Sequence, residues 1–387
     1  IANALKMQPS NKYSTWDNIM QLCLNMYEDN QDYLKYCLKL SKAVKLSAQR
    51  LLLQNRDVRF EDLYWQAVKF EAPHLFDSYL LYLERKRLEQ DRFYSPKRKQ
   101  LNKHGLIQSL QDLEDDKLDI LSISMPPGTQ KTTLEKFFAS WIIGRHPDDF
   151  SLFFSHSGDI TRMFYDGVMD ITTNSDEYCW QEIFPDVKFH STNAKRETIN
   201  FNKYKPFSNI QCTSVGSKNA GKVRANRYLY CDDLIGGIEE ALNKNILDKL
   251  WRIYGTDAKQ RKMDGCKEIH IATRWSVHDV IGRLIDIYEG NDKDRFIAIP
   301  DIDPVTGESN FDYKYNGFSV EFFHDQELTM DEISYKCLYK NEPIEREGLL
   351  YTDEELRRFI TLPLGEPDAI LGICDTKNTG TDSMFLP

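Results

Sequence analysis

The sequence predicts an α/β protein with a mostly parallel β-sheet. Short apolar runs have the length and composition of strands, and helical stretches alternate with them. Strands that alternate with helices are typical of crossover units, in which the strands run parallel. A ligand site is expected just past the carboxyl ends of such strands. The predicted strands are residues 117–125, 150–157, 227–233, 268–275 and 296–303, and the main helices between them are 132–144 and 277–288.

Helical segments are expected on both sides of this α/β core. Apolar residues in 60–68 and 75–83 repeat at the spacing of one helical face, so residues 1–90 predict a small helical domain. The remaining divisions are an α/β core at 91–313, a helical lid subdomain at 314–345, a polar linker at 346–366 and the start of a further domain at 367–387.

The composition argues against several classes of protein. The chain has 387 residues and 41% hydrophobic content, enough for two or three globular domains. A net charge of −10 argues against a histone-like general DNA-binding protein. The cysteines have neither C-x-x-C nor zinc-finger spacing, which indicates a reduced, cytosolic protein. No signal peptide or membrane-spanning run is visible, so no membrane partner is expected.

The stretch MPPGTQKTTLEKFF, residues 125–138, is the first candidate site. It joins a buried strand to a helix, as a phosphate-binding loop does, although only Gly128 remains of the usual glycines. In such a loop the helix start binds phosphate, Lys131 contacts the β- and γ-phosphates, and the Thr132 hydroxyl holds Mg²⁺. The alternative is a capped helix start with an incidental lysine. The predicted nucleotide-binding residues are Pro127, Gly128, Thr129, Gln130, Lys131, Thr132 and Thr133.

Two further segments favour the nucleotide interpretation. Asp232 and Asp233 end a predicted strand. In a nucleotide hydrolase the first such acid binds Mg²⁺, and the next orients or deprotonates the attacking water. Thr273 ends another strand, where a polar side chain could sense the γ-phosphate. The alternatives are a solvated Asp-Asp turn and a buried Trp275 beside an ion pair of Arg274.

The order and amino-acid sequences of these segments resemble those of the large terminase subunit of tailed bacteriophages and prophages. The resemblance covers residues 95–387, roughly three-quarters of the chain. The matching segments, in the family's order, are MPPGTQKTT, ASWIIGRHPDDFSLFFSHS, SVGSKNAGKVRANRYLYCDDLIGGIEEA, HIATRWSVHDVIGRLI, YKCLYKNEPIEREGLLY and ILGICDTKNTGTDS.

The resemblance implies an ASCE-type P-loop ATPase core followed by the truncated start of a ribonuclease-H-like nuclease domain. Lys131 and Thr132 match the Walker A lysine and hydroxyl, Asp232 matches the Walker B metal acid, and Asp233 stands where the catalytic carboxylate is found. Asp375 matches the first metal-binding acid of the nuclease, which uses Mg²⁺ or Mn²⁺. Such terminases hydrolyse ATP to drive double-stranded DNA into a procapsid, and they cut the DNA to length.

The resemblance also implies partners and a location. A homo-oligomeric ring of about five subunits is expected on the portal protein, together with a small terminase subunit. The location implied is the cytoplasm of the bacterial host, with transient docking on the procapsid. No competent nuclease is expected from this chain, because two-metal cleavage needs several carboxylates and only Asp375 and the further candidate Asp382 are present.

The chain departs from the family at its phosphate loop. Many relatives carry arginine at the position of Gly128 and glycine at that of Gln130. The source of a transition-state arginine is therefore open, and Arg224, Arg227 and an arginine of a neighbouring subunit are candidates. At the Walker B strand, Glu239 or Glu240 could replace Asp233 as the catalytic carboxylate.

Basic residues gather in two stretches, 195–227 and 85–103. The first has Glu197 as its only acid and contains interleaved aromatic residues, so it could track the phosphates of DNA without reading its bases. The alternative is a pair of solvated loops with lysine-rich edges.

The leading prediction is an ATP-hydrolysing motor that translocates double-stranded viral DNA into a procapsid, with a C-terminal metal-dependent endonuclease that is largely missing here. One alternative is another P-loop nucleic-acid translocase of the helicase kind, although helicases usually need a second motor domain. The other is a non-hydrolysing DNA-binding assembly scaffold with a degenerate loop.

Overall fold

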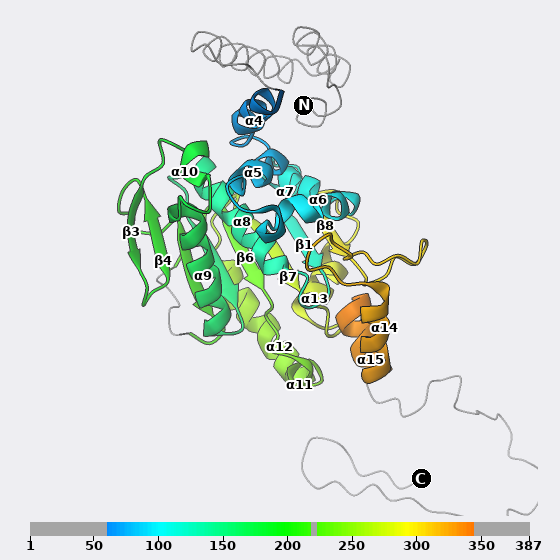
Figure 1. Ribbon diagram of the computed structural model, residues 1–387. Helices are drawn as coiled ribbons and strands as arrows, with labels where there is room; N and C mark the ends of the chain where they lie inside the picture. The colour runs from blue at the N-terminus through cyan, green and yellow to red at the C-terminus, as the bar shows by residue number, and fades with distance from the viewer. Residues whose placement is uncertain (1–59, 218–222, 344–387) are drawn as a thin grey trace, which may run out of the picture. The chain divides into compact units, whose positions relative to one another are not determined.

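The computed structural model describes residues 60–217 and 223–343 (Figure 1). Within these residues an eight-stranded sheet has the order β3-β4-β5-β2-β6-β7-β1-β8. All neighbours from β5 to β8 in this order are parallel, whereas the β3–β4 and β4–β5 pairs are antiparallel. The predicted α/β class with a mostly parallel sheet is confirmed.

The bounds of the strands and helices follow the chain. The strands are β1 (Ile120–Ser124), β2 (Ser151–Ser155), β3 (Phe189–Asn193), β4 (Thr198–Phe201), β5 (Ile210–Ser214), β6 (Tyr228–Asp232), β7 (Lys267–Ala272) and β8 (Asp294–Ala298). The helices are α4 (Phe60–Glu71), α5 (Phe76–Leu83), α6 (Tyr94–Lys103), α7 (Leu106–Glu114), α8 (Lys131–Arg145), α9 (Gly158–Thr173), α10 (Trp180–Ile183), α11 (Ile238–Ala241), α12 (Lys244–Ile253), α13 (Val280–Tyr288), α14 (Val320–Thr329) and α15 (Glu332–Tyr335). Short 3₁₀ or π turns are η1 (Glu89–Asp91), η2 (Tyr254–Ala258), η3 (Lys259–Arg261) and η4 (Lys336–Lys340).

The five predicted strands correspond to β1, β2, β6, β7 and β8, so these predictions are confirmed. Strands β1, β2 and β6 are buried along their whole length, because helices cover both faces of the sheet. The sequence did not reveal β3, β4 and β5, which extend the sheet at one edge. Strand β3 forms that edge and is mostly exposed.

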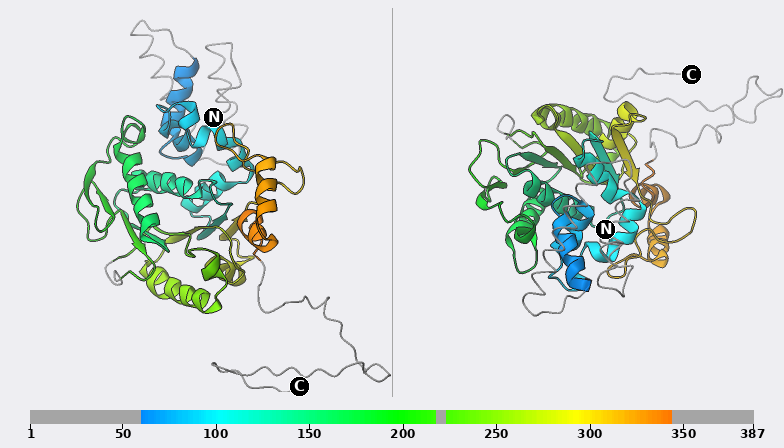
Figure 2. Two further views of the ribbon diagram at one scale, coloured as in Figure 1. Left: turned by 60° about the horizontal axis from the view of Figure 1, so that its bottom comes forward. Right: turned by 90° about the horizontal axis from the view of Figure 1, so that it is seen from above.

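Helices cover the two faces of the sheet in separate layers (Figure 2). On one face α8 and α9 pack on alternate residues of β2 and β6. Phe153 stacks on Phe164 of α9 at 3.8 Å, and Tyr230 belongs to the same apolar cluster. On the other face Leu229 of β6 and Leu284 of α13 share a second cluster. Because side chains alternate along each strand, Tyr228, Tyr230 and Asp232 all point toward α8 and α9.

Helix α5 shares the core of α8. The ring of Phe76 lies 5.2 Å from that of Trp141, and the Tyr79 hydroxyl lies 2.6 Å from the Ser140 hydroxyl. The predicted division at residue 90 and the other domain boundaries stay predictions. Residues 1–59 and 344–387, which hold the predicted linker and nuclease start, lie outside the described residues.

A buried carboxylate, that of Glu114, joins α7, α8 and β6. The Glu114 side chain at the end of α7 accepts hydrogen bonds from Arg145 at 2.9 Å, His146 at 2.6 Å, Arg227 at 2.7 Å and Tyr228 at 2.8 Å. Burial alone would raise its pKa, but the bonds from His146 and Arg227 lower the pKa of Glu114 to about 2. The carboxylate thereby ties the end of α8 to the start of β6.

None of the described helices combines the length and apolarity that crossing a membrane requires.

Candidate nucleotide site

The loop between β1 and α8 has the backbone of a glycine-rich turn with a single glycine. Gly128 has φ +76° and Gln130 has φ +67°, both in the left-handed region. The Thr129 hydroxyl closes the turn by donating to the Pro126 carbonyl at 2.7 Å. Because the first N–H groups of any α-helix lack intrahelical partners, the start of α8 offers donors and a positive dipole end to an anion.

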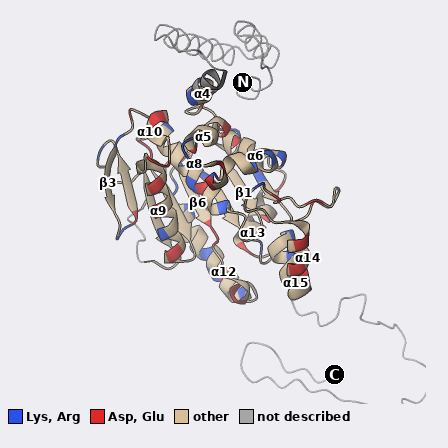
Figure 3. Ribbon diagram, in the orientation of Figure 1, with Lys and Arg blue, Asp and Glu red and all other residues tan. Residues whose placement is uncertain are grey.

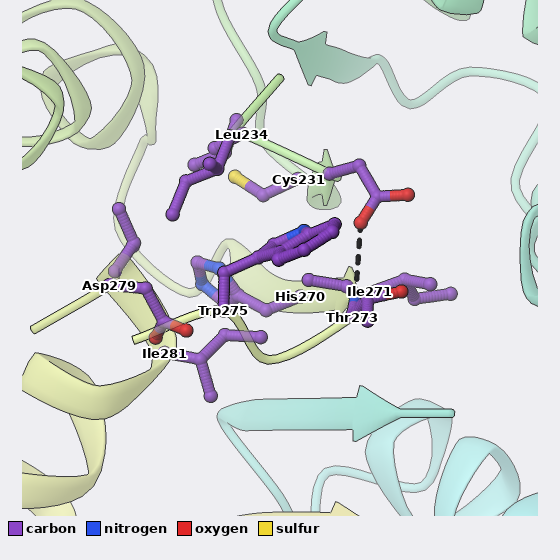
Figure 4. Close-up of a pocket in the computed structure, with 12 residues that line it drawn as sticks. Cys231, Leu234, His270, Ile271, Thr273, Trp275, Asp279 and Ile281 are labelled. Atoms are coloured by element: carbon purple, nitrogen blue, oxygen red, sulfur yellow. Dashed lines mark hydrogen bonds between the residues drawn. The ribbon is translucent and has the colours of Figure 1, made fainter. Parts of the chain in front are cut away.

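Lys131 reaches across the loop to β7. Its Nζ donates to the Met125 carbonyl at 3.2 Å and to Thr273 Oγ1 at 2.5 Å. The Thr273 backbone N–H donates to Asp233 Oδ1 at 3.1 Å, which is the dashed line in Figure 4. Thr273 therefore links the loop lysine to Asp233, the acid directly after β6.

Thr132 meets the first acid of β6. Its Oγ1 donates to Asp232 Oδ2 at 2.7 Å, while Asp232 Oδ1 is buried with no hydrogen-bond partner. Burial and the charge of Asp233 raise the pKa of Asp232 to about 7. A divalent cation fits this donor set, because Mg²⁺ prefers hydroxyl and carboxylate oxygens and its charge would offset the cost of burying the carboxylate.

Asp233 holds an unusual backbone conformation. Its φ is +38°, and its backbone carbonyl oxygen lies 2.5 Å from His156 Nδ1 and 3.3 Å from the His156 backbone nitrogen. A positive φ at a non-glycine residue costs free energy, and such strain is concentrated at functional sites. His156 holds the backbone carbonyl of Asp233, and the Thr273 N–H holds its carboxylate beside the cavity.

A cavity of about 450 Å³ opens over these residues. Its volume lies in the range of small-molecule sites, and it occupies the carboxyl ends of parallel strands, as predicted. Leu338 of η4 reaches into it from the C-terminal helices, and Phe318 lies 3.2 Å from where a Cβ on Gly128 would stand. The predicted site residues among its lining are Pro127, Gly128, Gln130, Lys131, Thr132, Thr133, Asp233 and Thr273.

The structure brings together every predicted residue of the nucleotide site that it describes. Thr129 is buried beneath the turn, and Asp232 lies behind Thr132. Asp375 lies outside the described residues. Arg227 is bonded to Glu114 at the end of β6 opposite Asp232. Arg227 does not line the cavity, so the structure does not bring this candidate arginine to the nucleotide site.

Two charged residues of α8 were missed by the sequence analysis. Lys136 lines the cavity and lies against Gly167 of α9, where an added Cβ would stand 2.6 Å from Lys136 Cδ. Burial lowers the pKa of Lys136. Glu135 is 1% exposed and both its carboxyl oxygens lack partners. Burial, then the charges of Asp232 and Asp233, raise the pKa of Glu135 well above its usual range.

A second, smaller cavity of about 20 Å³ lies beside Asp233, with room for about one water molecule. Figure 4 shows the Trp275 side chain beside His270 in its wall. The predicted ion pair of Arg274 is present, with its Nε 3.0 Å from Asp279 Oδ2. Residues 273–275 therefore combine Thr273, which lines the large cavity, with the ion pair of Arg274 that was the alternative interpretation.

The basic stretch at 195–227 is only partly a surface. Lys195 and Arg196 lie exposed in the turn between β3 and β4, whereas the Lys205 ammonium is buried and donates to Asn209 Oδ1 at 2.9 Å. Figure 3 shows basic and acidic residues interspersed along the described helices.

The stretch at 85–103 contains several structural contacts. Arg98 pairs with Asp77 at 2.7 Å, and Lys97 is buried. Among the described basic residues, the β3–β4 turn is therefore the better candidate for binding phosphate.

The comparisons with known proteins include a partial similarity to a solved structure. No family model and no curated protein matches the chain. Among solved structures, the chain is similar to the large terminase of bacteriophage HK97, with a TM-score of 0.36 and 12% identity. The aligned part covers 58% of this chain and 44% of that one. Because a similarity of this size does not establish a shared fold, the function is inferred below from the geometry of the site.

Proposed function

We propose that the chain is an ATP-hydrolysing motor of the P-loop class that translocates double-stranded DNA, as the large subunit of a viral DNA-packaging terminase. The observation that carries this proposal is a pair of contacts at the start of α8. Lys131 meets Thr273 of the β7 end, and Thr132 meets Asp232 of the β6 end, at one cavity.

The residues present fit a magnesium nucleotide. Thr132 and Asp232 would hold Mg²⁺, and the start of α8 with Lys131 would bind the β- and γ-phosphates. When bound, MgATP supplies the phosphoryl group that is transferred and the cation that offsets its negative charge.

The chain's own residues would then position the reacting groups. Asp233, fixed by Thr273 and His156, would orient a water molecule and accept its proton. Lys136 is a second cation at the cavity and would oppose negative charge on the phosphates. This assignment needs no arginine from the phosphate loop, although it leaves room for one from a neighbouring subunit.

The other parts of the proposal rest on the sequence resemblance. They are the nuclease acid Asp375, the portal and small-subunit partners, the ring of about five subunits and the docking on a procapsid in the host cytoplasm. The exposed β3–β4 turn is the described surface that we assign to DNA.

Steady-state ATP hydrolysis with and without double-stranded DNA tests the motor. We expect DNA to stimulate turnover in the wild type, and Lys131→Ala to abolish it. Tight ATP binding with no turnover above that of Lys131→Ala, in the presence of DNA, would instead support the assembly scaffold. Stimulation by single-stranded DNA together with strand separation would support a helicase-like translocase.

A further inference from the structure

Buried polar groups without hydrogen-bond partners gather behind the phosphate loop. Glu135 on α8 has two such oxygens, and Asp232 Oδ1, Ser155 Oγ and the Tyr230 hydroxyl each lack a partner. The four residues are at most 1% exposed. A buried polar atom left unpaired destabilises the folded state, and native proteins leave few of them.

The four side chains belong to the same layer between α8 and the sheet. Ser155 and Asp232 are register partners on β2 and β6, so they point to the same face. Tyr230 lies two residues before Asp232 and shares that face. Glu135 lies three residues after Thr132, which bonds Asp232, so it stands on the same side of α8. Burial, and then the charge of Glu135, raise the pKa of Tyr230 well above its usual range.

The chemistry of this cluster suits water better than a metal ion. No group of three or more metal-ligating His, Cys, Asp or Glu side chains occurs in the described part of the chain. A buried water molecule typically makes about three hydrogen bonds to groups that would otherwise be unpaired. Two hydroxyls and two carboxyl groups supply the donors and acceptors that such a molecule needs.

We propose that Glu135, Ser155, Tyr230 and Asp232 enclose ordered water, and that Glu135 positions the Asp232 carboxylate through it. The hydrogen bond reaches the inner oxygen of Asp232, and its outer oxygen stays on Thr132, facing the metal position. Glu135 touches neither nucleotide nor metal, so it is a positioning residue. This inference rests on the proposed function, because it assigns Asp232 to the nucleotide's Mg²⁺.

A high-resolution crystal structure of the chain tests the water directly. We expect density for a water molecule within hydrogen-bond distance of both Glu135 and Asp232. A dry cluster, or a direct bond between the two carboxyl groups with no water, would overturn the proposal. This experiment does not depend on nucleotide binding, so it also separates a failure of the cluster from a failure of the proposed function.

The second test measures how the affinity for a fluorescent ATP analogue depends on Mg²⁺. Outer partners of metal ligands typically affect metal affinity by about 10- to 100-fold. We expect Glu135→Met to raise the Mg²⁺ concentration for half-maximal binding at least about 10-fold, and Glu135→Gln to restore it to within about 3-fold of wild type. Affinity in the absence of Mg²⁺ should not change. Equal Mg²⁺ dependence in Glu135→Met and the wild type would contradict the proposal.

Single-atom variants cover the case in which Glu135→Met does not fold. Tyr230→Phe and Ser155→Ala each remove one hydroxyl oxygen and keep the packing. Each variant should raise the Mg²⁺ concentration for half-maximal binding, as Glu135→Met does. The double variant should raise it further. No effect from either variant or from the pair would show that the cluster does not act on Asp232. Loss of nucleotide binding in the wild type itself would refute the proposed function alone.

Discussion

Lys131 and Thr273, separated by 142 residues in the sequence, are joined by a hydrogen bond of 2.5 Å from Nζ to Oγ1. The bond connects the start of α8 to the end of β7. The Thr273 backbone then holds Asp233, so one threonine contacts both Lys131 and the candidate catalytic acid. A change at Thr273 should therefore affect both Lys131 and Asp233.

The first prediction concerns this threonine. We expect Thr273→Val, which keeps the shape but removes the hydroxyl, to lower ATP turnover by about 10- to 100-fold, because misplaced catalytic groups cost this much. Thr273→Ser retains the hydroxyl and should keep most of the activity. The measurement is kcat and KM for both variants. A KM effect with unchanged kcat would show that Thr273 contributes only to binding.

The second prediction concerns Lys136. Its replacement by methionine removes the charge and keeps the stem that packs on Gly167. We expect kcat to fall on the order of 100-fold, as when one transition-state donor is lost. The unfolding midpoint should stay unchanged. Lys293→Met, at an exposed lysine before β8, is the matched control and should retain full turnover. Full turnover in Lys136→Met would return the search to an arginine of a neighbouring subunit.

The third prediction concerns Gln130, whose φ is +67°. A non-glycine residue in this conformation costs about 1–2 kcal/mol, whereas glycine loses about 0.5–1 kcal/mol more entropy on folding. Gln130→Gly should therefore raise the free energy of unfolding by about 0.5–1 kcal/mol. Urea denaturation measures the change, and Gln130→Ala should remain close to wild type. A less stable glycine variant would mean that the glutamine side chain stabilises the turn.

The fourth prediction is a loss of stability in acid through Glu114. Because folding lowers the pKa of this group from 4.5 to about 2, its contribution is complete above about pH 4.5 and is lost as the pH falls toward 2. The shift corresponds to on the order of 3 kcal/mol. We expect Glu114→Gln to lower the free energy of unfolding at pH 7 and to flatten its dependence on pH below 4.5.

Urea titrations between pH 7 and pH 3 measure this effect. Asp166→Asn removes the exposed ion pair with Arg162 and is the control, since such pairs contribute little. If the wild type and Glu114→Gln lost stability in parallel with acid, other carboxylates would be responsible.

The fifth prediction concerns the β3–β4 turn. We expect Lys195→Glu with Arg196→Glu to weaken binding to double-stranded DNA irrespective of its sequence. The slope of log affinity against log salt should fall by about one for each DNA phosphate that the variant no longer neutralises. Lys293→Glu, at the opposite edge of the sheet, should bind DNA as the wild type does. Equal salt slopes in all three proteins would exclude the turn as a DNA-binding surface.

The sequence predicted the parallel strands because each is a continuous apolar run bounded by turns. It did not predict β3, β4 and β5 for a physical reason. Strand β3, FHSTN, is an exposed edge strand with few apolar residues, β4 has only four residues, TINF, and β5, IQCTS, is rich in polar residues. Only their pairing in the sheet reveals them. The basic residues around them were the stronger local signal, and this favoured a loop.

The residues of the candidate site were predicted from local motifs. The buried charged groups around it were not predicted. Strand ends followed by a lysine, a threonine or paired acids mark Lys131, Thr132, Asp232 and Asp233. Glu135 follows no motif and stands in an ordinary helix, so its burial depends on how α8 packs. The same holds for Arg227, whose partner Glu114 lies 113 residues earlier in the chain.

The two ends of α8 have a mechanical consequence. At its first turn Thr132 bonds Asp232 at the end of β6, and at its last turn Arg145 shares Glu114 with Arg227 and Tyr228 at the start of β6. Both ends of α8 are thus held to the two ends of the same strand, β6. Movement of α8 relative to β6 would have to break one of these two sets of bonds. Met163 of α9, Trp275 after β7 and Leu338 of η4 also line the cavity and belong to neither set of bonds, so these segments can move at the cavity while α8 and β6 stay together.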